Sequence, residues 1–166
     1  EVAKAHHKPL LVLEALRCGY EWASDRLHAF VLQGMEDNAA AFGKAGVSYL
    51  PYVEERVGQG KGLLEELARH AVSVVADDYP AFFLPRMLGA ASKLSTQVVA
   101  VDSNGLLPMR STQRTFTTAA SFRRHLQKRL LGHLLEAPQP EPLKHYGLGA
   151  ARLPAGVASR WPKASP

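Results

Sequence analysis

The sequence predicts an α/β fold built on a parallel sheet of about four strands, followed by a basic helix and an extended tail. Short apolar, β-branched runs alternate with helical segments, which is the rhythm of parallel strands joined by right-handed crossovers. The chain has 166 residues, of which 46% are hydrophobic, so it can fill one core of ordinary size. The last third is basic and then rich in Pro and Gly, which predicts the helix and the tail.

The strand predictions come from apolar runs rich in Val and Leu and bounded by turn residues. The run at 72–77 is the clearest, because it is β-branched, apolar and acidic at its end. Pro51 removes one ladder donor and therefore moves its strand towards a sheet edge. The four predicted strands cover residues 9–16, 47–53, 72–77 and 97–102.

A long helix is predicted from about 26 to 45, with Ser24 or Asp25 as its cap and Gly46 at its end. Its apolar residues repeat at helical spacing and are expected to face the core: Leu27, Phe30, Val31, Met35, Ala39 and Phe42.

A glycine-rich segment, GQGKG at 58–62, precedes the next predicted helix, GLLEELARHA. It lacks the full spacing of a phosphate-binding loop, so a flexible loop is the favoured interpretation and a phosphate site the minor one. A further short helix is expected to end near residue 94.

Residues 118–135 form a predicted basic helix, followed by Pro138, Pro140 and Pro142. The remainder to residue 166 is interpreted as a linker or an ordered crossing segment. The apolar face of the helix carries Ala119, Phe122, Leu126, Leu130 and Leu134.

The charge of the chain is unevenly distributed. Residues 1–102 hold 10 Lys and Arg against 13 Asp and Glu, a net −3, whereas residues 103–166 hold 10 against 2, a net +8. A basic segment of this kind fits a polyanion such as DNA, and a solvated basic helix explains it equally well. The residues that would meet phosphates or acidic side chains are Arg110, Arg114, Arg123, Arg124, Lys128 and Arg129.

Several classes of function find no support in the sequence. No apolar run approaches the ~20 residues that span a bilayer, and the start has no cleavage signal, so a cytoplasmic protein is expected. Cys18 is the lone cysteine and is expected to be a buried or half-buried thiol, which argues against a structural zinc site. The seven histidines lack the spacing of metal ligands, so no metal site is expected. The sequence has no GxSxG motif, the nucleophile elbow of many hydrolases, so it does not support a hydrolytic activity.

Ligands of parallel α/β sheets bind beyond the carboxyl ends of the strands, so the loops there hold the candidate binding residues. The alternative is structural: Asp77 or Asp78 caps a turn, and Asp102 ties its loop to backbone amides. Phe82, Phe83 and Tyr79 could stack on a ligand, but core packing is favoured for all three. The candidates are Asp77, Asp78, Tyr79, Arg86, Asp102 and Asn104.

Several of these segments, in order along the chain, resemble the N-terminal domain of class II-like bacterial deoxyribodipyrimidine DNA photolyases, of the photolyase/cryptochrome family. The closing segment resembles the crossover ahead of that family's flavin domain, so the resemblance covers almost the whole chain. The segments are KPLLVLEALRCGYEWASDRLHAFVLQGMEDNAAAF, VVADDYPAFFLPRMLGAA, VDSNGLLPMR, SFRRHLQKRLLGHLLEAPQPEPL and RLPAGVASRWPKAS.

The resemblance implies a Rossmann-like doubly wound domain over residues 1–136, able to hold an antenna chromophore such as a deazaflavin at the six candidates above. It also implies that 137–166 is an interdomain linker to an FAD-binding helical domain absent from this chain. The intact parent would be a flavoprotein lyase of DNA repair that splits cyclobutane pyrimidine dimers in damaged DNA by light-driven electron transfer from FAD. No catalytic residue is assigned to this chain.

Three other interpretations stay open: a stand-alone Rossmann-like nucleotide or flavin-binding module, an inactive remnant, and part of a cryptochrome-like sensor. The family also has a first strand, in the middle of a 3-2-1-4-5 sheet, that is missing ahead of Glu1. The sheet is therefore expected either to close the gap, by pairing the strands near 9–16 and 72–76, or to stay split. Both outcomes expose ladder groups, which predicts marginal stability.

Overall fold

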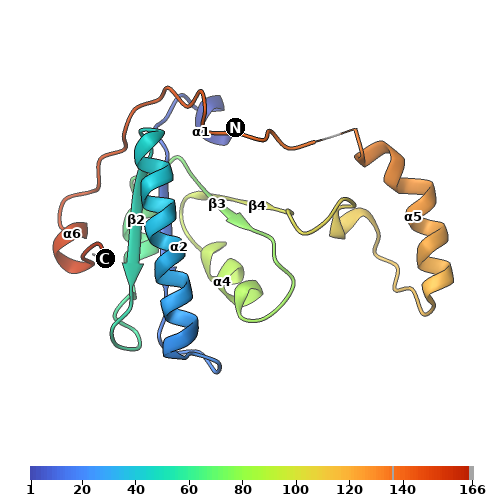
Figure 1. Cartoon of the computed structure of the whole chain (residues 1–166), viewed down its shortest axis with the longest axis horizontal. Coiled ribbons are helices and arrows are strands. Elements are labelled where there is room, and N and C mark those ends of the chain that lie inside the picture. The colour runs from blue at the N-terminus through green and yellow to red at the C-terminus, as the bar shows by residue number, and fades with distance from the viewer. Residues whose placement is uncertain (136, 165–166) are drawn as a thin grey trace. The chain divides into compact units, whose positions relative to one another are not determined.

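The computed structural model describes residues 1–135 and 137–164 (Figure 1). The chain divides into two compact units. The first unit combines Glu1–Val72 with Glu141–Pro166, and the second is Ser73–Pro140. The expected domain boundary at residue 136 lies outside the described residues, as do the last two residues of the expected linker. Each unit is described below by itself.

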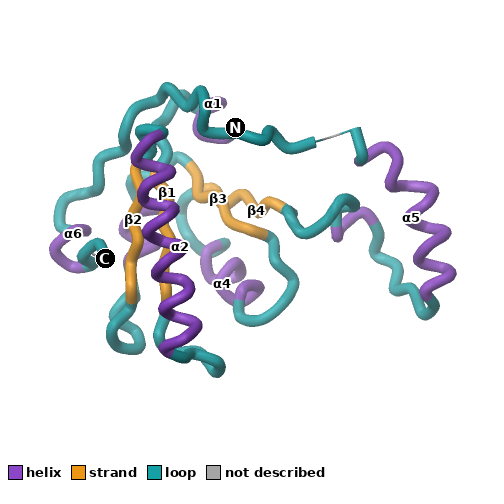
Figure 2. Tube along the Cα trace, viewed as in Figure 1, coloured by secondary structure: helices purple, strands orange, loops and turns teal. Residues whose placement is uncertain are grey.

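The first unit contains a parallel pair of strands, β1 (Leu11–Leu16) and β2 (Ser48–Val53), connected by the long helix α2 (Asp25–Lys44) (Figure 2). The Ser24 side chain accepts a hydrogen bond of 3.3 Å from the amide of Leu27 and so caps α2. The sequence-based predictions of both strands, of this helix and of its cap are confirmed.

The two faces of this sheet are covered by different helices, because successive side chains of a strand point to opposite sides. On one face Tyr49 contacts the ring of Phe42 on α2, with ring centroids 5.2 Å apart. The Tyr49 hydroxyl also donates a hydrogen bond to Glu14 of β1, which in turn accepts one of 2.9 Å from Asn38 of α2. Burial, followed by this hydrogen bond, raises the pKa of Tyr49, so the phenol stays protonated.

The other face of the β1–β2 sheet carries the main core. Here Leu50 and Tyr52 of β2 pack against α3 (Leu63–Ala68) and α6 (Val157–Arg160). The core is completed by Leu63, Leu67, Val157 and Trp161, with Leu11 and Leu13 packed against it.

The apolar stripe of α2 is less buried than the sequence predicts. Of its six members only Met35 is buried, and Leu27 and Phe30 are 46% and 75% exposed. The reason is length: twenty helical residues extend ~30 Å, whereas a six-residue strand extends ~20 Å, so one end of α2 extends past the sheet. The prediction that the whole stripe is core was wrong for Leu27 and Phe30.

The C-terminal segment, for which the sequence left a linker and an ordered crossing segment open, belongs to the first unit from Glu141 onward. Tyr146 is buried, receives a hydrogen bond from the amide of Leu10, and donates one of 3.0 Å to the carbonyl of Gly149. Further along, Trp161 is only 2% exposed, and its indole N–H donates to the carbonyl of Gln59 at 3.1 Å. Three residues of the segment that composition marks as a tail, Tyr146, Val157 and Trp161, are therefore part of the core of the first unit.

The second unit contains another parallel pair, β3 (Ser73–Asp77) and β4 (Gln97–Val101), connected by α4 (Leu84–Ala91). None of the residues of these two strands is buried, and Val75 and Val101 are about half exposed. After β4 come a short 3-10 turn, Met109–Ser111, and the basic helix α5.

The four predicted strands are confirmed as strands, but a single four-stranded sheet is not observed. Among the described residues, β1 pairs with β2 and β3 pairs with β4, which leaves two separate two-stranded sheets. Of the two outcomes expected for the sheet, the split one is observed, so the fold is a mixed α/β fold with short parallel sheets.

The basic helix α5 spans Ala119–His133 and is capped by Thr118, whose hydroxyl accepts a hydrogen bond of 3.2 Å from the amide of Ser121. None of its residues is buried, and Leu131 is 72% exposed. Ahead of the helix, the ring of Phe116 contacts those of Phe122 and His125. No helix among the described residues, α5 included, combines the length and apolarity that crossing a bilayer requires.

Candidate functional site

The carboxyl ends of β3 and β4 carry most of the candidate binding residues. Parallel pairing puts both strand ends at one edge of the sheet, and the Asp78 amide donates a hydrogen bond of 2.8 Å to the carbonyl of Val101 there. Asp78 follows β3 directly and is 9% exposed, whereas its neighbour Asp77 is exposed and accepts a hydrogen bond from Ser103. The end of β3 thus carries one buried and one exposed carboxylate.

Asp78 forms a two-point ion pair with Arg110. The guanidinium Nε lies 2.8 Å from one carboxylate oxygen, and Nη2 lies 3.2 Å from the other. The Asp78 side chain is 12% exposed and that of Arg110 is 80% exposed, so the pair has a buried acidic partner and a solvated basic one. The hydrogen bond from Arg110, and then the charge of Asp78, raise the pKa of the guanidinium, which is permanently charged.

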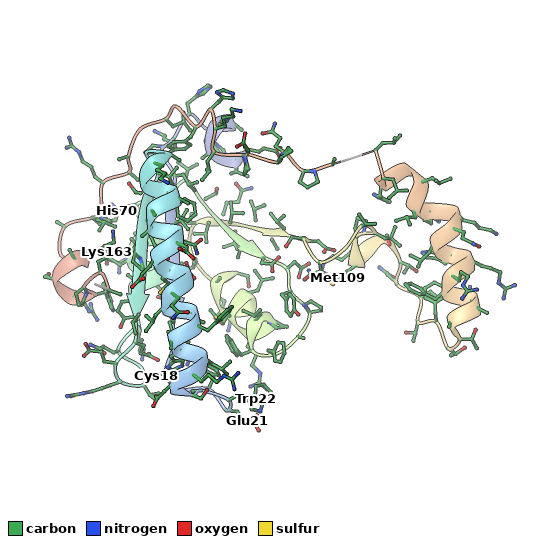
Figure 3. The ribbon with its side chains drawn as sticks, in the orientation of Figure 1. Cys18, Glu21, Trp22, His70, Met109 and Lys163 are labelled. Atoms are coloured by element: carbon green, nitrogen blue, oxygen red, sulfur yellow. The ribbon has the colours of Figure 1, made fainter. Side chains whose placement is uncertain are left out.

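Asp102 organises the loop that follows β4. Its two oxygens accept hydrogen bonds from the amide of Met109 at 2.6 Å and from the amide of Asn104 at 3.2 Å (Met109 is labelled in Figure 3). The Asn104 side chain then donates a hydrogen bond of 2.9 Å to the carbonyl of Asp78, which joins the ends of β3 and β4. The structure therefore agrees with the structural alternative for Asp102, in which its carboxylate ties the loop to backbone amides.

The Asp102 carboxylate predicts an acid-sensitive loop. The hydrogen bonds from the amides of Met109 and Asn104 lower the pKa of Asp102 in the folded protein. The stability that the ionised carboxylate gives the loop is therefore complete above the ordinary Asp pKa of ~3.9, and it is lost as the pH falls through the lower pKa of the folded state. We expect the Met109 amide resonance in an NMR titration to shift at a pH below that ordinary value. The shift should disappear in Asp102→Asn, and a Met109 transition at or above ~3.9 would refute the assignment.

An open hollow of about 530 Å³ on the surface of the second unit, called the cavity below, adjoins the Asp78–Arg110 pair. One side is the loop after β3, the other is one face of α4, and Met109 contributes from the loop after β4. The lining residues are Asp78, Tyr79, Pro80, Pro85, Leu88, Gly89, Ser92, Met109 and Arg110. The lining combines the apolar side chains of Pro80, Pro85, Leu88 and Met109 with polar ones, a mixture that sites for organic ligands commonly have.

The aromatic residues and Arg86 divide between the cavity and its surroundings. Tyr79 lines the cavity and stacks on Phe82, with ring centroids 6.4 Å apart and an interplanar angle of 11°. Phe82 is 66% exposed and has a left-handed φ of 60°, so the core packing expected for it was wrong, and Phe83 is 37% exposed. Arg86 is exposed on α4 and is not a lining residue.

Of the basic candidates, only Arg110 belongs to this site. Arg114 lies over the ring of Phe116, 5.4 Å from its centroid. The four cations of α5 are exposed, and none has a carboxylate within ion-pair distance in the described part of the chain: Arg123, Arg124, Lys128 and Arg129.

Sequence reasoning did not pair Arg110 with Asp78, because the two residues are 32 positions apart and no local pattern connects them. It also did not identify the α4 face of the cavity. The available signal was the helical spacing of Pro85, Leu88, Gly89 and Ser92, whose apolar and small side chains share one face.

Within residues 1–135 and 137–164 no group of three or more His, Cys, Asp or Glu side chains is arranged to hold a metal ion. No protein-family model matches the chain, and no curated protein matches it either.

Proposed function

We propose that this chain is the antenna-chromophore domain of a DNA photolyase, and that the cavity at the ends of β3 and β4 holds the pigment. The observation that carries the proposal is this open hollow, in which apolar side chains and the Asp78–Arg110 pair form one lining. The resemblance along the sequence supports the same assignment, because two of the resembling segments, VVADDYPAFFLPRMLGAA and VDSNGLLPMR, supply every residue of its lining except Ser92.

The dimensions and chemistry of the cavity suit a planar chromophore. Its volume of about 530 Å³ falls within the range of small-molecule sites, ~300–1,000 Å³. Pro80, Leu88 and Met109 offer apolar contacts to a ring, and Tyr79 adds an aromatic one. Arg110 uses two of its five N–H donors on Asp78, so the others are available to carbonyl oxygens of a deazaflavin or flavin.

The chemistry of dimer splitting would belong to the intact parent. There, FAD in a helical domain would supply the electron, and damaged DNA would bind to that assembly. This chain would contribute light capture, and its exposed cations Arg123, Arg124 and Lys128 would contact DNA phosphates or acidic side chains of the helical domain.

A fluorescence titration of the purified chain with a deazaflavin, and separately with a flavin, tests the proposal. We expect saturable binding of one molecule per chain. Replacement of Arg110 by Ala should weaken that binding about tenfold or more, because it removes charge-assisted donors. Arg114→Ala is the matched control, since Arg114 lies outside the cavity lining, and should leave affinity unchanged. Equal losses in both variants, or no binding by the unmodified chain, would count against the cavity as the pigment site.

A further inference from the structure

A second polar cluster lies in the first unit, at the carboxyl edge of the β1–β2 sheet. Cys18, which is labelled in Figure 3, lies in the loop after β1, and Glu54 directly follows β2. Because the two strands are parallel, both residues lie at the same edge of the sheet. The Glu54 amide donates to the carbonyl of Leu16 at 2.9 Å, which continues the strand pairing by one residue. Glu54 is only 5% exposed, so its carboxylate must find its hydrogen-bond partners inside the protein.

Four donors converge on the Glu54 carboxylate. Oε1 accepts from the amides of Gly58 at 2.8 Å and Gly60 at 3.4 Å, and Oε2 accepts from the Cys18 amide at 3.2 Å and the Cys18 thiol at 3.6 Å. Burial by itself raises the pKa of Glu54, but the amide bonds from Cys18, Gly60 and Gly58 outweigh it, and the net pKa is lowered. The cluster therefore favours a negative charge at this position.

The backbone around the carboxylate is shaped for close approach. Gly58 has a φ of +87°, and a Cβ on Gly60 would lie 3.1 Å from the Tyr52 ring and 3.7 Å from Glu54 Oε1. A Cβ on Gly19, in the loop after β1, would lie 2.8 Å from the Val57 side chain. Glycines at these positions let the two loops press together around the anion, as in glycine-rich turns that bind phosphate.

A buried hydroxyl beside the cluster is an independent sign of an anion site. Tyr52 is 3% exposed, and its hydroxyl has no hydrogen-bond partner among the described residues. Burial raises the pKa of Tyr52, and the charges of Glu54 and Glu55 raise it further, which indicates that the hydroxyl lies within their field. Once the Glu54 carboxylate is removed, this unpartnered donor is available to an anion that takes its place.

We propose that the amides of Cys18, Gly58 and Gly60 form an anion-binding cradle for a small carboxylate or inorganic phosphate, which this chain closes with its own Glu54 side chain. The glycine-rich segment 58–62, which lacks the spacing of a phosphate-binding loop, thus binds an anion that the chain supplies itself. Glu54 also holds the Cys18 thiol as a donor: burial first, and then the hydrogen bond and charge of Glu54, raise the pKa of the thiol. The inference stands apart from the pigment site, because all its residues belong to the first unit.

The test removes the Glu54 carboxylate by substitution and then supplies a free carboxylate in its place. In Glu54→Ala the missing part of the side chain has the size and charge of acetate, so we expect ¹³C-acetate to bind this variant saturably, by NMR, and not to bind the unmodified chain. Inorganic phosphate, titrated separately, should compete with acetate. Alkylation of Cys18, the single cysteine, by iodoacetamide should be about tenfold faster in the variant and return towards the original rate with acetate.

Glu55→Ala is the matched control, because Glu55 is the exposed neighbour and its side chain does not hydrogen-bond to Cys18; it should change neither measurement. A folded Glu54→Ala protein that fails to bind acetate, or that alkylates at the original rate, overturns the proposal. If circular dichroism shows that this variant is unfolded, acetate should restore its structure, and a failure to do so also overturns the proposal. Glu54→Gln fills the cradle with a neutral group and should bind no acetate.

Discussion

Replacing Trp161 with Ala should lower the free energy of unfolding of the first unit by about 3–5 kcal/mol, the usual cost of deleting a large buried aromatic side chain. Trp161 is 2% exposed, packs with Leu50 and Leu63 in the core, and donates its indole N–H to Gln59. Its loss would leave a cavity between α3 and α6 and an unpaired carbonyl. Urea unfolding followed by circular dichroism measures the effect.

Trp22→Ala is the matched control, because Trp22 is the other tryptophan of the chain and is 58% exposed. It should change stability by less than about 1 kcal/mol, as surface substitutions usually do. Equal effects of the two substitutions would mean that the C-terminal segment is not part of the core, and would return residues 141–164 to the role of a linker.

Replacing Gly89 with Leu should abolish most pigment binding while preserving the fold. Gly89 lies on α4 and lines the cavity, and a Cβ there meets no heavy atom within 4 Å, so a larger side chain enters the cavity without a clash. Filling the ligand space should weaken affinity by about 10–100-fold, the equivalent of 1–3 kcal/mol of overpacking. Stability should rise by up to ~1 kcal/mol, because glycine is a poor helix residue.

The control for this prediction is Gly43→Leu, since Gly43 is also helical and open to a Cβ but lies on α2 in the first unit. A fluorescence titration with a deazaflavin compares the three proteins. If Gly89→Leu binds pigment as tightly as the unmodified chain, the pigment site lies elsewhere.

Local signals in the sequence predicted the elements well. Strand β2 followed from its β-branched and aromatic run, and α2 from its apolar spacing with Ser24 as cap, because these signals act over a few residues. Which strands pair depends on contacts between residues far apart in the sequence. The sequence therefore predicted that the sheet would either close or divide into two, but it could not decide between these outcomes. Composition hid the C-terminal part of the core: Trp161 lies among Pro, Ala and Gly residues that are typical of a linker.

For the candidate site, one general rule predicted the cluster at the strand ends, but of the six candidates only Asp78 and Tyr79 line the cavity. Because ligands bind beyond the carboxyl ends of parallel strands, Asp78, Asp102 and Asn104 were expected in one place, and hydrogen bonds connect all three. Arg110 was assigned to a group of phosphate contacts by its charge alone, since no sequence pattern reports an ion pair between residues 32 positions apart. Arg86 was included because it follows β3 closely, but helix geometry turns it away from the lining residues.

The central claim, that this chain is an antenna domain, is tested most directly by its absorption spectrum between about 300 and 500 nm, the near-ultraviolet and blue region in which such pigments absorb. The chain would be purified from a host that makes both deazaflavin and flavin, alongside Gly89→Leu prepared in the same way. We predict a bound chromophore in the unmodified chain and its loss in the variant. A colourless unmodified chain, purified folded from that host, would contradict the claim.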